Sequence, residues 1–367
     1  MKNIVIDARE WSTTTGRYTE RLVNYLQEVD KDKSHRYFIL QTPKDVANWQ
    51  PTSKRFIKIP TRFKEFTFGE QIGLLIQIMR LKPDLVHFPM VQQPILYQGK
   101  VVTTMQDLTT LRFTNPSKNR LVFKFKQRIY WWVNFIAARK SAAIITPTEF
   151  VKDDVARHMH ANSRKITVTL EAGDTIEAAP EPLEELEGKR FIMYVGRPTP
   201  HKNLDRLIDA FAILKQTHPD LHLALVGKTD TLFRRHERET KRKGIPDVHF
   251  TGFVPDSQLK WLFQHTAAYI FPSLSEGFGL PALEAMSCGA PVVSSNATCL
   301  PEVYGDAAYY FDPLNTEEMA QAIGKVIDSE KLRTQLSEAG KKQVKKYSWR
   351  RMAEQTLDVY RQVLGEK

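Results

Sequence analysis

Two glutamates in a glycine-bearing segment carry the strongest chemical signal in this sequence. Glu276 and Glu284 lie in the segment that reads SLSEGFGLPALEAM. Glycine lets a backbone approach a ligand closely, and the N–H groups of Gly279 and Leu280 open a helix start that suits a phosphate. Because a carboxylate repels a phosphate, the two glutamates are expected to bind sugar hydroxyls on either side of it. The alternative is a structural turn with an acidic helix start.

Two cations and a small-residue loop form two further candidate sites. Arg197 and Lys202 bracket a short loop that opens a helix. Two cations at this spacing can bind a diphosphate, each charge-assisted contact contributing about 1.5–3 kcal/mol; the alternative is a solvated basic loop. The loop that contains Gly16 also opens a helix and could meet a phosphate. It matches neither the Walker loop nor the dinucleotide fingerprint, so it is a weak signal alone.

The elements that must position these residues follow a simple pattern. Short β-rich runs alternate with amphipathic helical stretches along the chain, which predicts right-handed crossovers and parallel sheets. Ligands of such sheets bind at the carboxyl ends of strands, and all three loops follow strands. The expected strands are 3–7, 37–40, 84–88, 101–105 and 143–146 in the first half, and 191–195, 222–226, 248–251, 268–272 and 291–294 in the second.

A change in composition marks a domain boundary. Residues 173–190 are acidic, proline-bearing and poor in β-branched side chains, which is typical of a linker. The sequence therefore predicts an N-terminal α/β domain over 1–172 and a C-terminal one over 191–347. The last stretch, 348–367, is an amphipathic helix that is expected to pack back on the first domain.

The composition is that of a basic globular protein. The chain has 367 residues with 42% hydrophobic and 26% charged side chains, and its formal net charge is +11. A basic balance favours an anionic partner, whether nucleic acid, anionic lipid or phosphorylated substrate. Cys288 and Cys299 are the two cysteines, too few for a disulfide framework or a cysteine-rich zinc module, and they fit a reducing cytoplasm. No apolar run is long enough for a transmembrane helix, and the N-terminal run is too short for a signal peptide.

Taken together, the motifs resemble glycosyltransferase family 4. The resemblance rests on EGFGLPALE followed by AMSCGAPVV, on the Arg197 to Lys202 loop, and on TGFVPD at 251–256. The segments SN…LPEV at 295–303 and YSW at 347–349 also fit. It implies a GT-B fold, in which two Rossmann-like domains with parallel sheets face a central cleft and a C-terminal helix crosses back. It also implies retaining transfer from a nucleoside-diphosphate sugar, which acts as co-substrate, without a metal or other cofactor.

The resemblance also implies roles for individual residues. Arg197 and Lys202 are expected to hold the diphosphate and stabilise the leaving group. Glu276 is expected to contact the donor-sugar hydroxyls and Glu284 the ribose hydroxyls. The other donor-binding positions are expected to be Gly16, Val254, Phe278, Gly279 and Leu280.

At one position the sequence departs from the family pattern. The family usually has His-Asp after the strand at 101–105, whereas this chain has Gln106 and Asp107. Glutamine can position a sugar by hydrogen bonds, but it cannot shuttle a proton at ordinary pH. Gln106 is therefore expected to be a catalytic positioning group. Asp107 and His87, which ends the strand at 84–88, are expected on the acceptor side.

Between Asp107 and Glu149 the sequence has no acidic residue, and basic and aromatic residues interleave there. On a helix, one stripe is expected to face the core. That stripe consists of Val122, Phe125, Ile129, Trp132, Val133 and Ile136. Another side suits an anionic membrane interface or a lipid-linked acceptor, with an ordinary solvated face as the alternative. That side consists of Lys124, Arg128, Trp131 and Phe135.

The sequence therefore predicts a retaining glycosyltransferase that acts on a glycan or lipid-linked acceptor. GDP-mannose is slightly favoured as donor over a UDP-sugar. The protein is expected in the cytoplasm with peripheral contact to the inner face of the membrane, and no nucleic acid partner is expected. Two alternatives remain open: a sugar-nucleotide epimerase on the same fold, and a catalytically silent protein that binds membranes or polyanions.

Overall fold

The computed structural model describes residues 1–13, 15–113 and 120–366, without the side chains of 120–124. These residues divide into two compact units. The first unit contains residues 1–112, 120–171 and 348–366, and the second contains residues 113 and 172–347.

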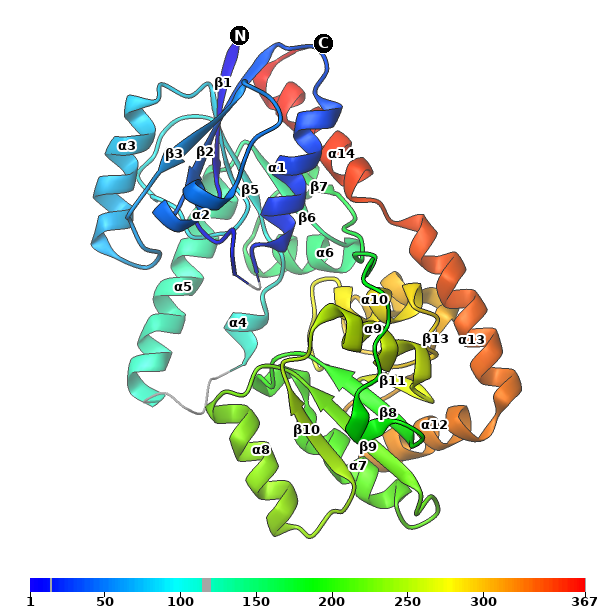
Figure 1. Ribbon diagram of the computed structural model, residues 1–367. Coiled ribbons are helices and arrows are strands. Elements are labelled where there is room, and N and C mark those ends of the chain that lie inside the picture. Colours follow the sequence, from blue (N-terminus) through cyan, green and yellow to red (C-terminus); the bar gives the residue numbers. More distant parts are fainter. Residues whose placement is uncertain (14, 114–119, 367) are drawn as a thin grey trace. The chain divides into compact units, whose positions relative to one another are not determined.

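The first unit is built on a parallel sheet with the strand order β3-β2-β1-β4-β5-β6-β7 (Figure 1). Its strands are β1 (Lys2–Asp7), β2 (His35–Gln41), β3 (Phe56–Pro60), β4 (Leu85–Phe88), β5 (Val101–Thr104), β6 (Ala143–Thr146) and β7 (Ile166–Val168). Every strand pair in this sheet is parallel. A parallel strand needs a crossover of a dozen or more residues to return, which explains why helices separate the strands.

Helices cover both faces of this sheet. They are α1 (Arg17–Val29), α2 (Pro43–Asn48), η1 (Glu70–Leu74), α3 (Leu75–Arg80), α4 (Thr109–Arg112), α5 (Arg120–Lys140), α6 (Glu149–His158), η2 (Ser163–Lys165) and α14 (Trp349–Leu364). On one face, Leu74 and Ile78 of η1 and α3 pack against Val5, Val86 and Val101 of the sheet. The C-terminal helix α14 packs on α1, so the end of the chain completes the core begun by its start.

The second unit repeats the plan with the strand order β10-β9-β8-β11-β12-β13. Its strands are β8 (Arg190–Val195), β9 (Leu221–Val226), β10 (Val248–Gly252), β11 (Ala268–Phe271), β12 (Val292–Ser295) and β13 (Ala308–Phe311). Its helices are η3 (Glu184–Leu186), η4 (Pro200–Lys202), α7 (Leu204–Leu214), α8 (Thr231–Arg242), α9 (Asp256–His265), α10 (Leu280–Ser287), α11 (Leu300–Tyr304), η5 (Gly305–Ala307), α12 (Thr316–Asp328), α13 (Glu330–Gln343) and η6 (Val344–Lys346). The core lies where α7 and α12 pack on β8, β9 and β11.

Every strand expected from the sequence overlaps a strand of the structure, and three further strands were missed. The missed strands are β3, β7 and β13, and each forms an edge of its sheet. Central strands of a parallel sheet are buried on both faces and read as continuous apolar runs. These edge strands are only partly buried, and β7 is short, so their apolar signal is weaker.

His87 does not face a substrate as expected, because it lies in the interior of the first unit. The side chain is fully buried in β4, and burial lowers its pKa to about 3. Its Nδ1 lies 2.5 Å from the Tyr360 hydroxyl of α14, and its Nε2 lies 2.8 Å from Thr104 Oγ1 of β5. With both ring nitrogens engaged, the neutral imidazole joins the sheet to the C-terminal helix.

Removing the Tyr360 hydroxyl should destabilise the first unit. Tyr360→Phe leaves His87 Nδ1 buried without its partner, which costs about 1–3 kcal/mol of unfolding free energy. Urea unfolding followed by circular dichroism measures this difference. Tyr25→Phe on α1 is the control and should change stability by under about 0.5 kcal/mol. Equal stability of the two variants would contradict the assigned role of the bond.

Candidate active site

The loops that carry the predicted donor residues follow two neighbouring strands of the second sheet. The order β9-β8-β11 places β8 beside β11, and connections leave these two strands in opposite directions. This is the topological switch point at which open α/β sheets bind ligands. The loop after β8 carries Arg197 and Lys202, and the loop after β11 carries Glu276.

Lys202 and Glu276 meet across this switch point. Lys202 Nζ lies 2.6 Å from Glu276 Oε1, and their side chains are 17% and 12% exposed. The two loops are also tied by the backbone, because Leu274 N–H donates to the His201 carbonyl at 2.7 Å. Lys202 Nζ lies 5.4 Å from the Phe271 ring centroid, a cation–π distance. The structure thus brings together a cation and a carboxylate that lie 74 residues apart in the sequence.

His201 is not a cation in this loop. Burial and the neighbouring Lys202 ammonium lower the pKa of His201 to about 4, although the Glu276 carboxylate opposes the shift. A neutral imidazole therefore sits beside the ion pair at neutral pH.

Arg197 has a partner that the sequence did not indicate. Its Nε lies 3.2 Å from Asp230 Oδ2, and the arginine side chain is 67% exposed. Asp230 also caps α8, because its Oδ1 accepts the N–H groups of Leu232 and Phe233. Burial opposes the shift, but these N–H groups and the Arg197 guanidinium hold the pKa of Asp230 below its usual value. The signal that could have pointed to Asp230 was an aspartate just before a helix, but nothing in the sequence paired it with Arg197.

Gly279 holds the start of α10 in a conformation that only glycine tolerates well. Its φ is +95°, and an added Cβ would lie 2.1 Å from the Tyr304 hydroxyl. That hydroxyl donates to the Gly279 carbonyl at 2.7 Å. No side chain caps α10, whose first residue is Leu280. The first N–H groups of the helix therefore have no side-chain cap, as an anion site at a helix start requires.

The remaining predicted donor residues of this unit are largely buried. Phe278 is 4% exposed and packs edge-on against Tyr347, with ring centroids 5.4 Å apart. Val254 is 6% exposed and follows β10. Glu284 is 8% exposed on α10, one turn beyond its start. The structure thus places Phe278 and Glu284 around the α10 start and Val254 after β10, at the outer edge of the sheet.

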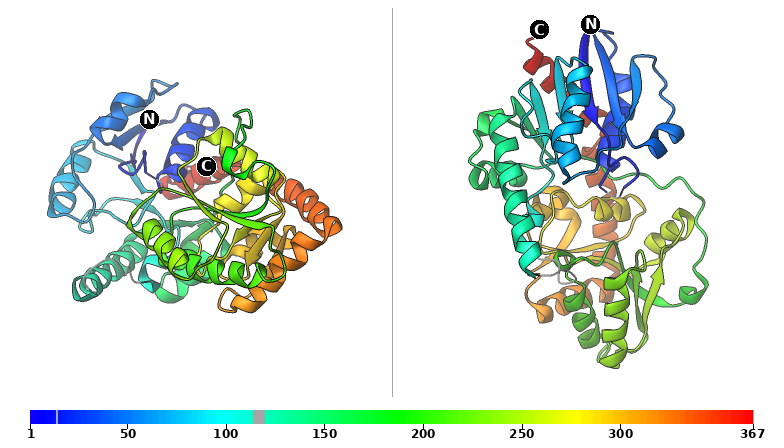
Figure 2. Two further views of the ribbon diagram at one scale, coloured as in Figure 1. Left: turned by 60° about the horizontal axis from the view of Figure 1, so that its bottom comes forward. Right: turned by 90° about the vertical axis from the view of Figure 1, so that its left-hand side faces the viewer.

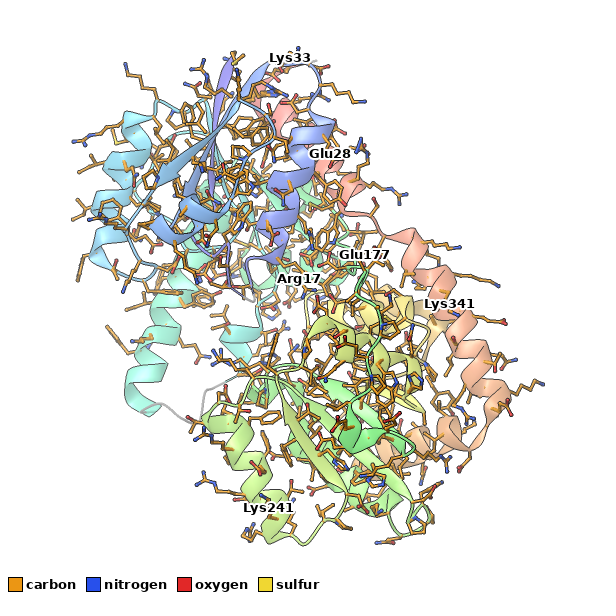
Figure 3. The ribbon with its side chains drawn as sticks, in the orientation of Figure 1. Arg17, Glu28, Lys33, Glu177, Lys241 and Lys341 are labelled. Carbon is orange, nitrogen blue, oxygen red and sulfur yellow. The ribbon has the colours of Figure 1, made fainter. Side chains whose placement is uncertain are left out.

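In the first unit, the predicted residues lie at the carboxyl edge of the sheet. Gly16 precedes α1, and an added Cβ there would lie 1.8 Å from the Glu10 carbonyl oxygen, so no larger residue fits. Figure 3 labels the next residue, Arg17, at the N-terminal end of α1. Gln106 and Asp107 follow β5, and Asp107 Oδ1 accepts the Thr109 N–H at 2.8 Å.

Glu171 is a polar neighbour of Gln106 that the sequence did not indicate. It lies just beyond β7, and its side chain is buried. Burial raises the pKa of Glu171 to about 7, with the nearby Gln106 amide and the Arg17 charge opposing the shift and the Asp107 charge adding to it. The residue lies two positions before the expected linker at 173–190, and no motif in the sequence singled it out.

A second polar group surrounds the end of β1. Arg9 is buried between two carboxylates, with its Nη2 at 2.7 Å from Asp7 Oδ2 and 2.8 Å from Glu70 Oε1. Burial, with the Glu10 carboxylate adding and the Arg9 charge opposing, raises the pKa of nearby Glu65 to about 7. The hollow beside this group is lined by Asp7, Arg9, Glu10, Thr19, Glu65, Met90 and Gln92.

The predicted membrane side of α5 is wrong in part. Trp131 and Phe135 stack on one another at 5.2 Å and pack against the buried cluster formed with β6 and α6. The large apolar side chains of α5 that are exposed are instead Phe125, Ile129 and Trp132. Both sides of the helix carry apolar residues, so periodicity alone does not decide which side meets the sheet. Arg128 is exposed as expected, whereas the side chains of Lys124 and Val122 lie outside the described residues.

The exposed side of α5 continues onto η1 and α3. Figure 2, right, shows α3 and α5 on the same side of the first unit, and the Phe66 ring lies 6.0 Å from the Tyr130 ring of α5. Among the described residues, the fully exposed side chains of this apolar-basic face include no acidic group, although Glu65, 24% exposed, lies between Lys64 and Phe66. Its apolar members are Phe66, Phe68, Ile72, Ile76, Met79, Leu96, Phe125, Ile129 and Trp132. Its basic members are Arg62, Lys64, Arg80, Lys82, Lys126 and Arg128.

Comparison with known proteins assigns the chain to a family. The family model described as Glycosyltransferase Family 4 matches residues 15–172, and the model described as Glycosyl transferases group 1 matches residues 175–343. The chain is a family 4 glycosyltransferase. The two models meet between residues 172 and 175, where the structure passes from the first unit to the second.

Individual relatives agree with this assignment. This glycosyltransferase is 29% identical over 382 residues to O-antigen chain mannosyltransferase B of Escherichia coli, a match that covers 95% of this chain and 96% of that protein. Its fold is similar to sucrose-phosphate synthase from Thermosynechococcus elongatus, with a TM-score of 0.77, 17% identity and complete coverage of both chains. It is also similar to Anabaena Alr3699/HepE in complex with UDP-glucose, with a TM-score of 0.72, 18% identity, and coverage of 98% and 99%. The fold class is GT-B, with two Rossmann-like units.

Within residues 1–13, 15–113 and 120–366, no group of three or more His, Cys, Asp or Glu residues is arranged to hold a metal ion. Over the same ranges, no helix is both long and apolar enough to cross a membrane.

Replacing Glu171 by glutamine should remove a pH-dependent loss of stability. The folded protein holds the Glu171 proton up to about pH 7, whereas the unfolded chain releases it near the ordinary value of 4.5. Stability therefore falls as pH rises through this window, by about 3 kcal/mol for this group. Urea unfolding at pH 5 and pH 8 measures the difference between Glu171→Gln and the natural protein, which should grow with pH.

The matched control is Glu177→Gln, an exposed carboxylate in the same segment (Figure 3). It should leave the difference between pH 5 and pH 8 unchanged. If Glu171→Gln behaves in the same way, burial does not hold the Glu171 proton.

Proposed function

We propose that this glycosyltransferase moves a mannosyl group from GDP-mannose to a hydroxyl of a glycan or lipid-linked acceptor. In this proposal the anomeric configuration is retained and no metal takes part. The observation that carries it is the Lys202–Glu276 ion pair at the switch point, beside exposed Arg197 and the start of α10, which has no side-chain cap. The mannosyl group is supported by the name of the Escherichia coli relative. A UDP-sugar is the alternative donor, in view of the UDP-glucose bound to the Anabaena protein.

When the donor binds, its diphosphate takes the place of the carboxylates that pair with the two cations. Lys202 turns from Glu276 toward a phosphate, and Arg197 leaves Asp230 or bridges it to the phosphate. The N–H groups of Gly279 and Leu280, at the start of α10, donate to the same anion. Glu276 then accepts hydrogen bonds from the donor-sugar hydroxyls, and Glu284 accepts those of the ribose.

Transfer breaks the bond between the anomeric carbon and the diphosphate oxygen. Negative charge grows on that oxygen, and Arg197 and Lys202 stabilise it, as preorganised cations do where charge develops. The acceptor oxygen bonds to the anomeric carbon on the same face, and its proton passes to the leaving phosphate. Two side-chain cations supply the charge that a divalent metal ion provides in other transferases.

Loss of Lys202 or Glu284 should weaken nucleotide binding. In the natural protein, GDP should raise the melting temperature by mass action, equally with and without EDTA. Lys202→Ala removes a charge-assisted contact of about 1.5–3 kcal/mol, which corresponds to a roughly 10- to 150-fold loss of affinity, and Glu284→Ala should have a similar effect. Titration calorimetry with GDP and UDP measures both.

Lys241→Ala on α8 is the control, because this lysine projects from the helix and pairs only with Glu237 in the described residues (Figure 3). Its GDP affinity should equal that of the natural protein. Stabilisation by UDP alone would move the donor to a UDP-sugar. A response that EDTA abolishes would overturn the metal-free step, and release of an altered free sugar without any acceptor would favour an epimerase.

We further propose that the apolar-basic face of the first unit docks on an anionic lipid surface. Most of the exposed large hydrophobic side chains of the described residues lie on this face, together with six basic ones and no fully exposed acidic one. Amphipathic helices with this composition lie in the membrane interface, and each basic residue near an anionic surface adds about 1 kcal/mol. Such docking would bring a lipid-linked acceptor to the enzyme.

Polar substitution of the face should release the protein from vesicles. The double variant Ile129→Ser with Trp132→Ser loses two side chains worth about 1.5–3 kcal/mol each when buried, so binding should fall at least tenfold. Flotation with vesicles of phosphatidylglycerol and phosphatidylcholine measures it, and binding to pure phosphatidylcholine should be weak. Leu314→Ser, which changes an exposed leucine of the second unit, should bind like the natural protein. Equal binding of all three proteins would overturn the docking surface.

A further inference from the structure

Gln106 and Glu171 present unpaired polar atoms to one another at the carboxyl edge of the first sheet. Glu171 Oε1, Gln106 Nε2 and Thr169 Oγ1 are all buried from solvent and have no hydrogen-bond partner among the residues that the structure describes. Gln106 is close enough to lower the pKa of Glu171, yet the two atoms do not form a hydrogen bond of acceptable geometry. Buried polar groups without partners are rare, so such a cluster requires an explanation.

The chemistry of the orphaned atoms defines what would satisfy them. The Gln106 amide nitrogen is a donor and the Glu171 carboxylate oxygen is an acceptor. A hydroxyl group can accept from the first and donate to the second at the same time. A fully ionised phosphate would offer the Glu171 oxygen no donor, and a cation would leave the amide unpaired. The pair therefore matches a hydroxyl better than any charged ligand group.

The surrounding elements hold these groups in place. Tyr18 of α1 is fixed by its hydroxyl, which lies 3.1 Å from Thr104 Oγ1 of β5. The Thr169 backbone is fixed to β6, because its N–H donates to the Thr146 carbonyl at 2.9 Å. Gln106 is partly exposed whereas Glu171 is buried, so the glutamine lies on the solvent side of the pair.

We propose that Gln106 and Glu171 bind one hydroxyl of a sugar substrate between them. The hydroxyl donates to Glu171 Oε1 and accepts from Gln106 Nε2, which fixes the orientation of the sugar ring in the first unit. This inference rests on the proposed function, because it requires a sugar substrate, and it adds Glu171 as a specificity-determining residue. The hydroxyl belongs either to the donor sugar or to the acceptor sugar.

The buried Glu171 carboxyl also lowers the stability of the fold, and good core packing does not require a carboxyl at this position. A buried carboxyl that is not fully paired destabilises the fold when it ionises, and glutamine would fill the same volume without that cost. Sites that bind ligands commonly sacrifice stability in this way.

The test compares the sugar with the nucleotide. Variants Gln106→Ala, Glu171→Ala and the double variant are titrated with GDP and with GDP-mannose. They are then assayed at saturating GDP-mannose for transfer to methyl glycosides of mannose, glucose, galactose and N-acetylglucosamine. Gln41→Ala is the matched control, because Gln41 is also a buried glutamine with unpaired amide atoms, at the end of β2. Its melting temperature is measured beside those of the other variants, so that a loss of stability is told apart from a loss of binding. Its KM values should equal those of the natural protein.

If the pair binds the donor sugar, each single variant loses about tenfold in affinity for GDP-mannose and nothing for GDP. If it binds the acceptor, donor affinity is unchanged and the KM for the methyl glycoside rises by about tenfold. In either case the double variant should resemble the single variants, because both groups hold one hydroxyl.

Unchanged GDP-mannose affinity together with unchanged glycoside KM would overturn the proposal and leave the pair to a bound water molecule. Where the natural protein binds GDP-mannose but uses none of the glycosides, unchanged GDP-mannose affinity alone counts against it. A natural protein that binds neither GDP nor UDP is a different outcome, because it overturns the proposed function before the pair is tested.

Discussion

The constraint on which the rest of this structure depends is the all-parallel pairing of both sheets. A parallel strand returns only by a crossover, so every strand of a sheet ends at the same edge and every functional loop leaves from that edge. Strands buried on both faces leave no room for charged side chains within the sheet. Arg197, Lys202 and Glu276 of the second unit, and Gln106 and Glu171 of the first, accordingly lie just beyond strand ends.

In the described structure, both cations of the expected donor site already have carboxylate partners. Lys202 pairs with Glu276, and Arg197 pairs with Asp230. Removing one partner of a shielded pair leaves an uncompensated charge, so each carboxylate both orients its cation and keeps it tolerable without ligand. In the proposed donor complex, a diphosphate would replace these carboxylates and restore the balance, which would release Glu276 for a neutral sugar. Arg197 is exposed to solvent, so exchanging Asp230 for another anion costs it little free energy. Lys202 is shielded from solvent, and Glu276 in the loop after β11 holds its ammonium group in place.

The first unit carries chemistry of a different kind. Its edge residues are a glutamine, a carboxyl with a raised pKa and a set of hydroxyls, which suit neutral sugar groups rather than phosphates. His87, which the sequence suggested for the acceptor side, is in the core, where it contacts the C-terminal helix. The same unit exposes the apolar-basic face on α3 and α5, so the proposed lipid-docking face and the proposed sugar-binding pair belong to one unit.

The sequence by itself determined the alternation of strands and helices, the two α/β units, the segments after strands that hold Arg197, Lys202 and Glu276, and the helix that holds Glu284. These features are local: a buried strand must be an apolar run, and a glycine at φ +95° or a loop opening a helix is fixed by its own residues. Only the tertiary structure decided which side of α5 is buried, because both of its sides are apolar. It also decided that His87 is in the core, that Asp230 pairs with Arg197, and that Glu171 meets Gln106. Each of these depends on contacts between residues far apart in the chain, and burial, which sets the pKa of His87 and of Glu171, exists only once those contacts form.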